Sequence, residues 1–245
     1  MVRGANDAAA VIADHISGSQ DAFVAEMNRY AVELGCKATV FKNAHGLHDP
    51  EQFTSARDIA KILNHALKNP EFEEIYSTVF YDVPATNMSE SRYLASSNYL
   101  MNNLVDLQIY YDGRVTGGRT GVTDDGKRCL AATAQSGGRK LLSVVMGSKS
   151  VYQDDGFTAI SFGTFSETSE LFTMAFDSYK AVQVVYDGQV FRQSTVLNGD
   201  SDVAMGANTS VYSVVPKNVT VSDLTFRYED IEEGITAPIA EGQKL

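Results

Sequence analysis

The feature that most constrains the fold of this chain is a change of hydrophobic period along it. Hydrophobic residues recur at helical spacing over much of the first 69 residues, and most later segments alternate as strands do. Three helices are expected, over residues 6–17, about 23–34 and 55–69. Because helical and strand patterns are largely segregated, the sequence predicts an α+β fold in which a helical block joins an antiparallel sheet.

The strand patterns divide the chain further. A short strand is expected at 78–83, followed by an irregular stretch to about Asp112 and a hairpin of 127–135 with 139–146. A helix is expected over 166–179, packing on the sheet through Phe172, Phe176 and Tyr179.

Beyond Lys180 only short strands are expected, at 181–186, 189–191, 210–215 and 219–228. We therefore expect two domains, 1–179 and 180–245, the second a small all-β domain. The chain opens on a helix start, where Asn6 or Asp7 can act as the cap, and it stops without a closing strand. The sequence is therefore expected to be cut at both ends.

Charge and composition exclude several classes of function. The formal net charge is -11 and no run of Lys or Arg occurs, so nucleic acid is not expected as a partner. Cys36 and Cys129 lack metal-ligand spacing. His45 and His48 could pair on a metal, but no acidic or cysteine cluster completes a site, and a hydrogen-bonded His45 in a turn is favoured. No metal and no cofactor are expected.

One glycine-rich stretch could bind a ligand. Gly117-Gly118-Arg119-Thr120-Gly121-Val122-Thr123 precedes the hairpin and predicts a strand bordering a groove. Arg119 and a threonine hydroxyl could hold a carboxylate, and Gly121 would let another backbone lie alongside. These residues fit a peptide with a free C-terminus. Taken alone, however, the stretch is better explained as a glycine-rich turn that leads into a strand.

Longer segments carry a family resemblance. NDAAAVIADHISGSQDAFVAEMN, ATVFKNAHGLHDPEQFTSARDIAKIL, YYDGRVTGGRTGVTDDGKRCLAATA and LLSVVMGS resemble the D-alanyl-D-alanine carboxypeptidases of the peptidase S11 family, which are low-molecular-mass penicillin-binding proteins. The likeness runs from Asn6 to about Tyr179, and the β region after it resembles the C-terminal domain of that family. It implies that 1–179 is a partial β-lactamase/transpeptidase-like domain.

The resemblance also implies a chemistry. The family uses an S-x-x-K serine nucleophile with its lysine, an S-x-N motif and a K-T-G strand, without a cofactor. The serine attacks the carbonyl between two D-alanines, and water then releases the shortened peptide. The implied partner is a peptidoglycan stem peptide ending in D-Ala-D-Ala, and β-lactam antibiotics would be covalent ligands of the complete protein. The complete protein would lie outside the cytoplasm, associated with the membrane.

The family motifs map incompletely onto this chain. Gly4-Ala5-Asn6 stands at the S-x-N position, with Gly4 in place of serine, and Arg119-Thr120-Gly121 stands at K-T-G. No S-x-x-K occurs, so the nucleophilic serine and its lysine are absent from the chain. The candidate catalytic positions are therefore Asn6 and Gly4. The candidate substrate-binding residues are Arg119, Thr120, Gly121, Thr123 and Asn98.

Arg119 and Gly4 depart from the residues that the family motifs have at these positions, and Asn98 does not belong to either motif. Arg119 can bind a carboxylate but cannot lose a proton as lysine can, and Gly4 removes a hydroxyl suited to proton transfer. Asn98 closes a second S-x-N pattern, Ser96-Ser97-Asn98, and is expected to line the cleft. The favoured hypothesis is an enzyme fragment without its nucleophile. The alternative is a non-catalytic pseudo-enzyme that binds peptidoglycan peptides.

Overall fold

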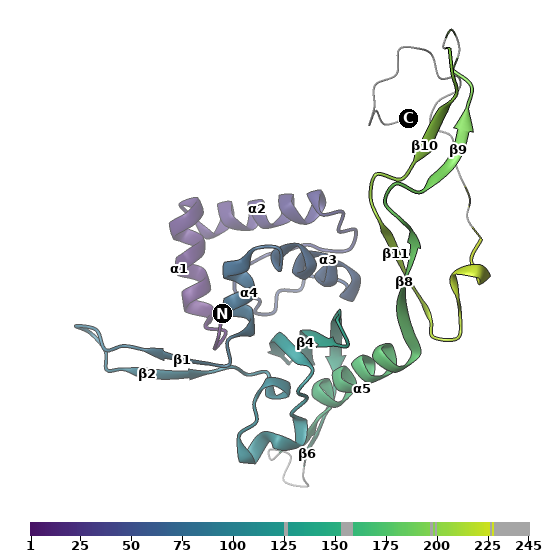
Figure 1. The fold of residues 1–245 in the computed structure, drawn as a ribbon. Coiled ribbons are helices and arrows are strands. Elements are labelled where there is room, and N and C mark those ends of the chain that lie inside the picture. Colours follow the sequence, from purple (N-terminus) through teal and green to yellow (C-terminus); the bar gives the residue numbers. More distant parts are fainter. Residues whose placement is uncertain (125–126, 153–158, 197, 199, 226, 228–245) are drawn as a thin grey trace. The chain divides into compact units, whose positions relative to one another are not determined.

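Four helices occupy much of the first 77 residues of this computed structural model: α1 Asn6–Ser17, α2 Gln20–Glu33, α3 Ala56–Ala66 and α4 Pro70–Ser77 (Figure 1). The structure describes all residues except 125–126, 153–158, 197, 199, 226 and 228–245. The three predicted helices are confirmed, and α4 was not predicted. The Asn69 side chain accepts the N–H groups of Glu71 and Phe72, so Asn69-Pro70 ends one helix and starts the next.

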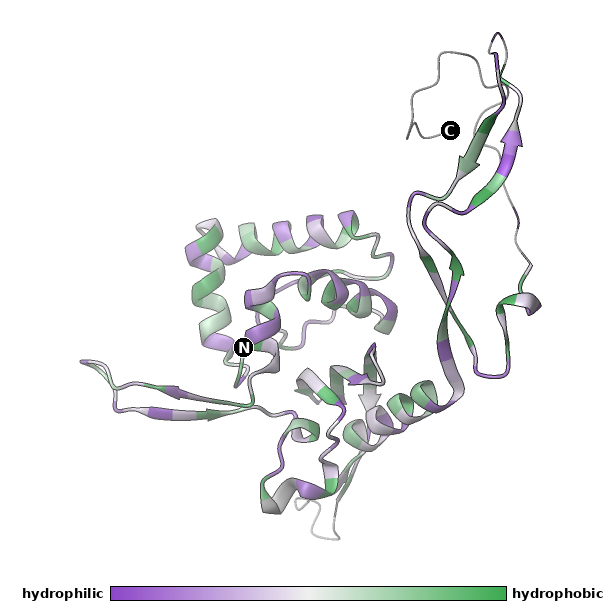
Figure 2. Cartoon of the chain, viewed as in Figure 1, coloured by the Kyte–Doolittle hydropathy of each residue, from purple (hydrophilic) through white to green (hydrophobic). Residues whose placement is uncertain are grey.

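The first helix differs from the prediction at its start. Its N-cap is Ala5 without a side-chain hydrogen bond, so neither Asn6 nor Asp7 caps it. Gly18, with φ 78°, ends it as expected. Figure 2 shows hydrophobic residues along α1, and Val11 and Ile16 are about two-thirds exposed at 66% and 65%. The hydrophobic side of α1 is therefore not covered by the residues that the structure describes.

Three long strands form the central antiparallel sheet, in the order β3 (Val115–Thr123), β4 (Lys127–Ser136), β5 (Arg139–Ser148). The predicted hairpin is confirmed, and Gly137 and Gly138 form its turn with φ of 55° and 75°. The predicted α+β class is confirmed as well. Within the described residues β3 pairs only with β4, so β3 is an edge strand.

The stretch expected to be irregular contains a second hairpin. β1 (Phe80–Val83) pairs with β2 (Arg92–Ala95) in a two-stranded sheet that projects from the helices (Figure 1). Two 3-10 helices follow, η1 (Tyr99–Met101) and η2 (Val105–Tyr110). The prediction included β1 but missed its partner, because the polar loop between them hides the short hydrophobic run of β2.

The chain divides into two compact units, Met1–Thr173 and Met174–Leu245. After the short strands β6 (Ser150–Tyr152) and β7 (Ala159–Phe162), helix α5 (Gly163–Ser178) crosses this division. Phe172 and Phe176 are buried as expected, whereas Tyr179 begins a strand and is 41% exposed. The buried hydrophobic residues of unit 1 include Ala13, Ala31, Leu63, Tyr76, Leu100, Leu130, Ala132, Ala134, Val145, Phe165 and Phe172.

The second unit contains two antiparallel pairs. β8 (Tyr179–Val185) pairs with β11 (Val211–Pro216), and β9 (Val190–Ser194) with β10 (Val203–Gly206). The strand predicted at 219–228 is wrong in its described part, where Val221–Asp223 form a 3-10 turn. The cause is a capping box between Thr220 and Asp223. None of the described helices has the length and apolar composition needed to cross a membrane.

Candidate functional site

The predicted ligand strand is β3, and two side chains clamp it from opposite faces. A Cβ added to Gly117 would lie 2.3 Å from the ring of Tyr76, and one added to Gly118 would lie 2.3 Å from the amide nitrogen of Asn98. Both clamps are fixed, because Tyr76 donates a hydrogen bond of 2.8 Å to the Ala131 carbonyl and Asn98 is fully buried. The glycine pair therefore allows this close packing, which no other residue type would permit.

Arg119 lies on the Tyr76 face of β3. Its guanidinium donates a hydrogen bond of 2.6 Å to the Gly118 carbonyl and another to the Ile75 carbonyl at the end of α4. The central carbon of the guanidinium lies 5.6 Å from the centroid of the Tyr76 ring. Burial lowers the pKa of Arg119. Its Nε–H is buried and has no acceptor among the described residues. A partly desolvated cation with an N–H group that lacks an acceptor is suited to binding an anion.

Thr120 lies on the opposite face, because side chains alternate along a strand. Its hydroxyl is 2.5 Å from the hydroxyl of Ser97. The structure therefore places Arg119 and Thr120 on opposite faces of β3. It adds Ser97, which the sequence reasoning passed over in favour of its neighbour. The signal was present, since Ser97 stands in the same S-x-N pattern.

The other residues predicted to bind substrate occupy different surroundings. Gly121 is exposed, and no atom lies within 4 Å of the place where its Cβ would be. The strand is therefore open at this residue, and its role in binding a peptide stays a prediction. Thr123, the last residue of β3, lies on the Arg119 face. Asn98 is 0% exposed and its Oδ1 accepts the Leu100 N–H, so it supports β3 from inside rather than lining a cleft.

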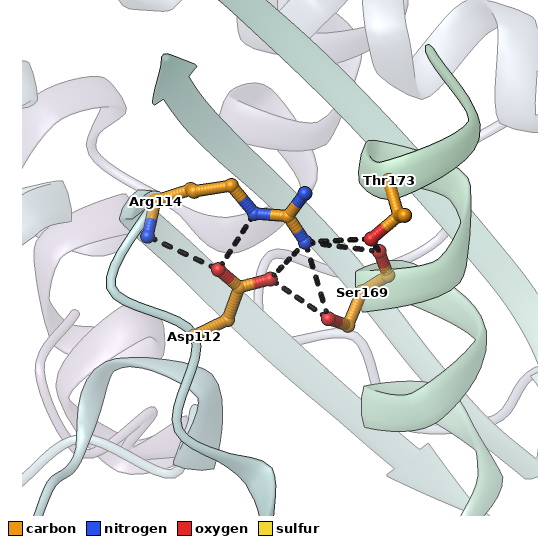
Figure 3. A network of polar contacts seen from close by, with 4 residues as sticks. All are labelled: Asp112, Arg114, Ser169 and Thr173. Carbon is orange, nitrogen blue, oxygen red and sulfur yellow. Dashed lines mark hydrogen bonds and ion pairs between the residues drawn. The ribbon is translucent and has the colours of Figure 1, made fainter. Parts of the chain in front are cut away.

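A charged network anchors the start of β3 (Figure 3). Arg114 donates to both oxygens of Asp112, at 2.9 and 2.7 Å, and reaches Thr173 of α5 at 2.9 Å. Ser169 of α5 donates 2.7 Å to the same Asp112 carboxylate. The Asp112 N–H donates to Leu100 of η1 at 3.0 Å. The network therefore fixes β3 relative to α5 and to the segment that carries Ser97.

The network predicts a dependence of stability on pH. Burial alone would raise the pKa of Asp112, but hydrogen bonds from Arg114 and Ser169 outweigh it and lower the pKa. A carboxyl with a lowered folded-state pKa stabilises the fold above its unfolded pKa of about 4, and this contribution is lost as the pH falls through the folded value. We expect Asp112→Asn to flatten the decline of the melting temperature below about pH 4. Asp14→Asn, at an exposed position in α1, is the control, and equal profiles for both variants would contradict the expectation.

Gly4 and Asn6 were predicted as catalytic positions. Gly4 is exposed, and its φ of 74° is a backbone conformation that favours glycine over serine. Asn6 is exposed, and its side chain makes no hydrogen bond within the described residues. No hydrogen bond among the described residues joins either of them to β3. Their catalytic role therefore stays a prediction.

Comparison with known proteins identifies the family. The family profile described as D-alanyl-D-alanine carboxypeptidase matches residues 1–150, and that of the penicillin-binding protein 5 C-terminal domain matches 179–245. The chain belongs to the peptidase S11 family of D-alanyl-D-alanine carboxypeptidases. The predicted resemblance is thus confirmed for both parts of the chain.

Individual S11 carboxypeptidases align along the whole chain. D-alanyl-D-alanine carboxypeptidase DacA of Haemophilus influenzae is 31% identical, covering 100% of this chain and 57% of the relative. DacC of Escherichia coli is 32% identical, covering 99% and 55%. The solved penicillin-binding protein 5 of H. influenzae aligns with a TM-score of 0.76 at 31% identity, over 99% of this chain and 64% of that one. The chain therefore spans little more than half the length of these curated relatives.

The histidines do not change this assignment. Among the described residues no group of three or more His, Cys, Asp or Glu side chains could hold a metal. His45 accepts the Leu47 N–H at 3.2 Å in a turn that contains Gly46 at φ 82°. The predicted structural role of His45 is confirmed.

Proposed function

We propose that this chain supplies the substrate-binding strand of a serine-type D-alanyl-D-alanine carboxypeptidase, which removes the terminal D-alanine from peptidoglycan stem peptides. The observation that supports this most is β3, an edge strand of an S11 sequence that is open at Gly121 and flanked by a half-buried cation. An extended peptide can add to such an edge through backbone hydrogen bonds.

In this proposal the two faces of β3 have separate tasks. The guanidinium of Arg119, whose Nε–H lacks an acceptor among the described residues, binds the terminal carboxylate of the peptide where it passes the strand edge. The paired hydroxyls of Ser97 and Thr120 lie on the other face and orient the peptide backbone near its scissile bond. The acyl-enzyme step needs a serine and lysine in S-x-x-K spacing, which these 245 residues do not contain. The isolated chain is therefore expected to bind without cleaving.

The substrate also implies a location. Peptidoglycan stem peptides lie outside the cytoplasmic membrane, so we propose that the complete protein acts there, associated with the membrane. β-Lactams, which are acylating ligands, would react with the complete protein only.

Binding by Arg119 can be measured on the chain itself. Titration of diacetyl-L-lysyl-D-alanyl-D-alanine, followed by calorimetry or NMR, is expected to give saturable binding. Arg119→Ala should weaken this binding by about 10- to 100-fold, because a hydrogen bond to a charged group contributes about 1.5–3 kcal/mol. Arg57→Ala, at an exposed position in α3, is the matched control. A C-terminally amidated peptide should bind the wild-type chain as poorly as the acid peptide binds Arg119→Ala.

Two results would contradict the proposal. One is wild-type affinity that does not distinguish the D-alanyl peptide from its L-alanyl counterpart. The other is covalent labelling of the 245-residue chain by a fluorescent penicillin, which would place a reactive nucleophile among residues that lack the S-x-x-K motif.

A further inference from the structure

The β1–β2 hairpin has exposed aromatic residues that the proposed catalytic function does not use. Tyr93 is 62% exposed and Tyr81 is 54% exposed. The two strands pair only with each other within the described residues, and a two-stranded hairpin alone is only marginally stable in water. Exposed rings on such a projecting element indicate a contact surface.

The strand register divides the hairpin into two faces. Asp82 lies directly opposite Tyr93, so these two side chains share a face. Phe80 joins them, because its ring stacks on Tyr93 with centroids 5.4 Å apart and an interplanar angle of 21°. Tyr81 is opposite Leu94 and lies on the other face. The Asp82 face is therefore an aromatic platform of two stacked rings, Phe80 and Tyr93, with a carboxylate opposite Tyr93.

This combination has a definite ligand chemistry. The outer face of Tyr93 offers a flat apolar π-surface, onto which the C–H face of a pyranose ring can stack. Asp82 is exposed, makes no hydrogen bond or ion pair within the described residues, and can accept from sugar hydroxyl and amide N–H groups. A neutral sugar also avoids the repulsion that a chain of net charge -11 exerts on anionic ligands.

The hairpin also leads into the candidate site. β2 ends at Ala95, and the next residue, Ser96, donates its N–H to Val79 at 2.7 Å and closes the base of the hairpin. Ser97 then contacts Thr120 of β3. A ligand on the platform and a peptide on β3 would thus both contact one continuous segment, which runs from the hairpin to Ser97.

We propose that the Phe80–Asp82–Tyr93 face binds the N-acetylhexosamine rings of the peptidoglycan glycan strand while β3 binds the attached stem peptide. This inference rests on the proposed function, because it assigns the sugar portion of the same substrate. It makes the hairpin a second recognition site, which favours peptides still attached to glycan over free peptides.

An NMR titration with a disaccharide-pentapeptide, the sugar-free pentapeptide and N,N′-diacetylchitobiose tests the proposal. The disaccharide-pentapeptide should bind more tightly than the free pentapeptide, and Tyr93→Ala should remove this difference, about 3- to 10-fold for one aromatic stacking contact. Tyr93→Phe should retain it. Tyr81→Ala, on the opposite face, is the matched control and should bind like wild type. Diacetylchitobiose should shift the resonances of Tyr93 and its neighbours.

The outcomes separate the two proposals. If the free pentapeptide binds but the sugar adds no affinity, the hairpin proposal is overturned and the proposed function stands. Equal weakening of sugar binding by Tyr81→Ala and Tyr93→Ala would also overturn the hairpin proposal. So would sedimentation that shows Tyr93-dependent self-association of a chain that does not bind the sugar. If sugar binding depends on Tyr93 but no peptide binds, the proposed function fails.

Discussion

Replacement of Asp58 with alanine is expected to lower the melting temperature of the chain by roughly 5–10 °C. Asp58 is only 2% exposed. One of its oxygens accepts the Ala38 N–H at 2.7 Å, the Lys37 N–H at 3.0 Å and the Thr39 hydroxyl at 3.0 Å. The carboxylate thus holds the segment that follows α2 against the first turn of α3.

The physical reason is the set of donors that the variant would leave. Alanine removes the acceptor of two backbone N–H groups and a hydroxyl in a part-buried location, and each unsatisfied donor retains its desolvation cost. The hydrogen bond from Ala38, with those from Thr39 and Lys37, lowers the pKa of Asp58. The stabilisation should therefore be complete above about pH 4 and decrease as the pH falls further.

Circular dichroism melts at pH 7 provide the measurement. Asp58→Asn keeps one acceptor oxygen and should lie between wild type and Asp58→Ala. Asp14→Ala, at an exposed position in α1, should melt like wild type. A melting temperature for Asp58→Ala within about 1–2 °C of wild type would show that the network contributes little.

The second large effect is expected at the clamp on β3. Gly118→Ala should cost about 1–3 kcal/mol of unfolding free energy and abolish binding of the D-alanyl peptide, because the new Cβ would overlap the Asn98 amide, 2.3 Å away. Asn98 cannot easily move, since it is fully buried and bound to the Leu100 N–H. β3 would shift instead.

A double variant makes this prediction sharp. The double variant Asn98→Ala with Gly118→Ala should lose less unfolding free energy than the two single variants lose together, because removal of the amide makes room for the methyl group. Gly121→Ala is the control in the same strand, where the Cβ would meet no atom within 4 Å and stability should change by less than about 0.5 kcal/mol. Additive effects in the double variant would contradict the clamp.

The sequence predicted those elements whose signal is local. The hydrophobic period located α1 to α3, and the Ser136-Gly137-Gly138 turn located the β4–β5 hairpin. Helix α4 was missed because Asn69-Pro70 carries both an end and a start signal. β2 was missed because four residues after a polar loop give too short a pattern. Both errors come from short elements whose stability depends on neighbours far along the chain.

The site was predicted in part for a similar reason. Strand β3 and the openness at Gly121 follow from residue types in sequence. The contact of Ser97 with Thr120 and the link of Asp112 to α5 join residues 23 and 57 positions apart, so no local pattern reveals them. The separation of Arg119 and Thr120 onto opposite faces was accessible from strand alternation alone.

The clamp on β3 also restricts which amino-acid substitutions this protein can accumulate during evolution. Each glycine is matched to one bulky neighbour, Gly117 to Tyr76 and Gly118 to Asn98. A larger residue at either glycine is tolerable only after its neighbour has become smaller, and a smaller neighbour alone leaves a gap behind the strand. Mutational paths at these four positions therefore run through pairs of substitutions, and single steps there are selected against even when no ligand contact is touched.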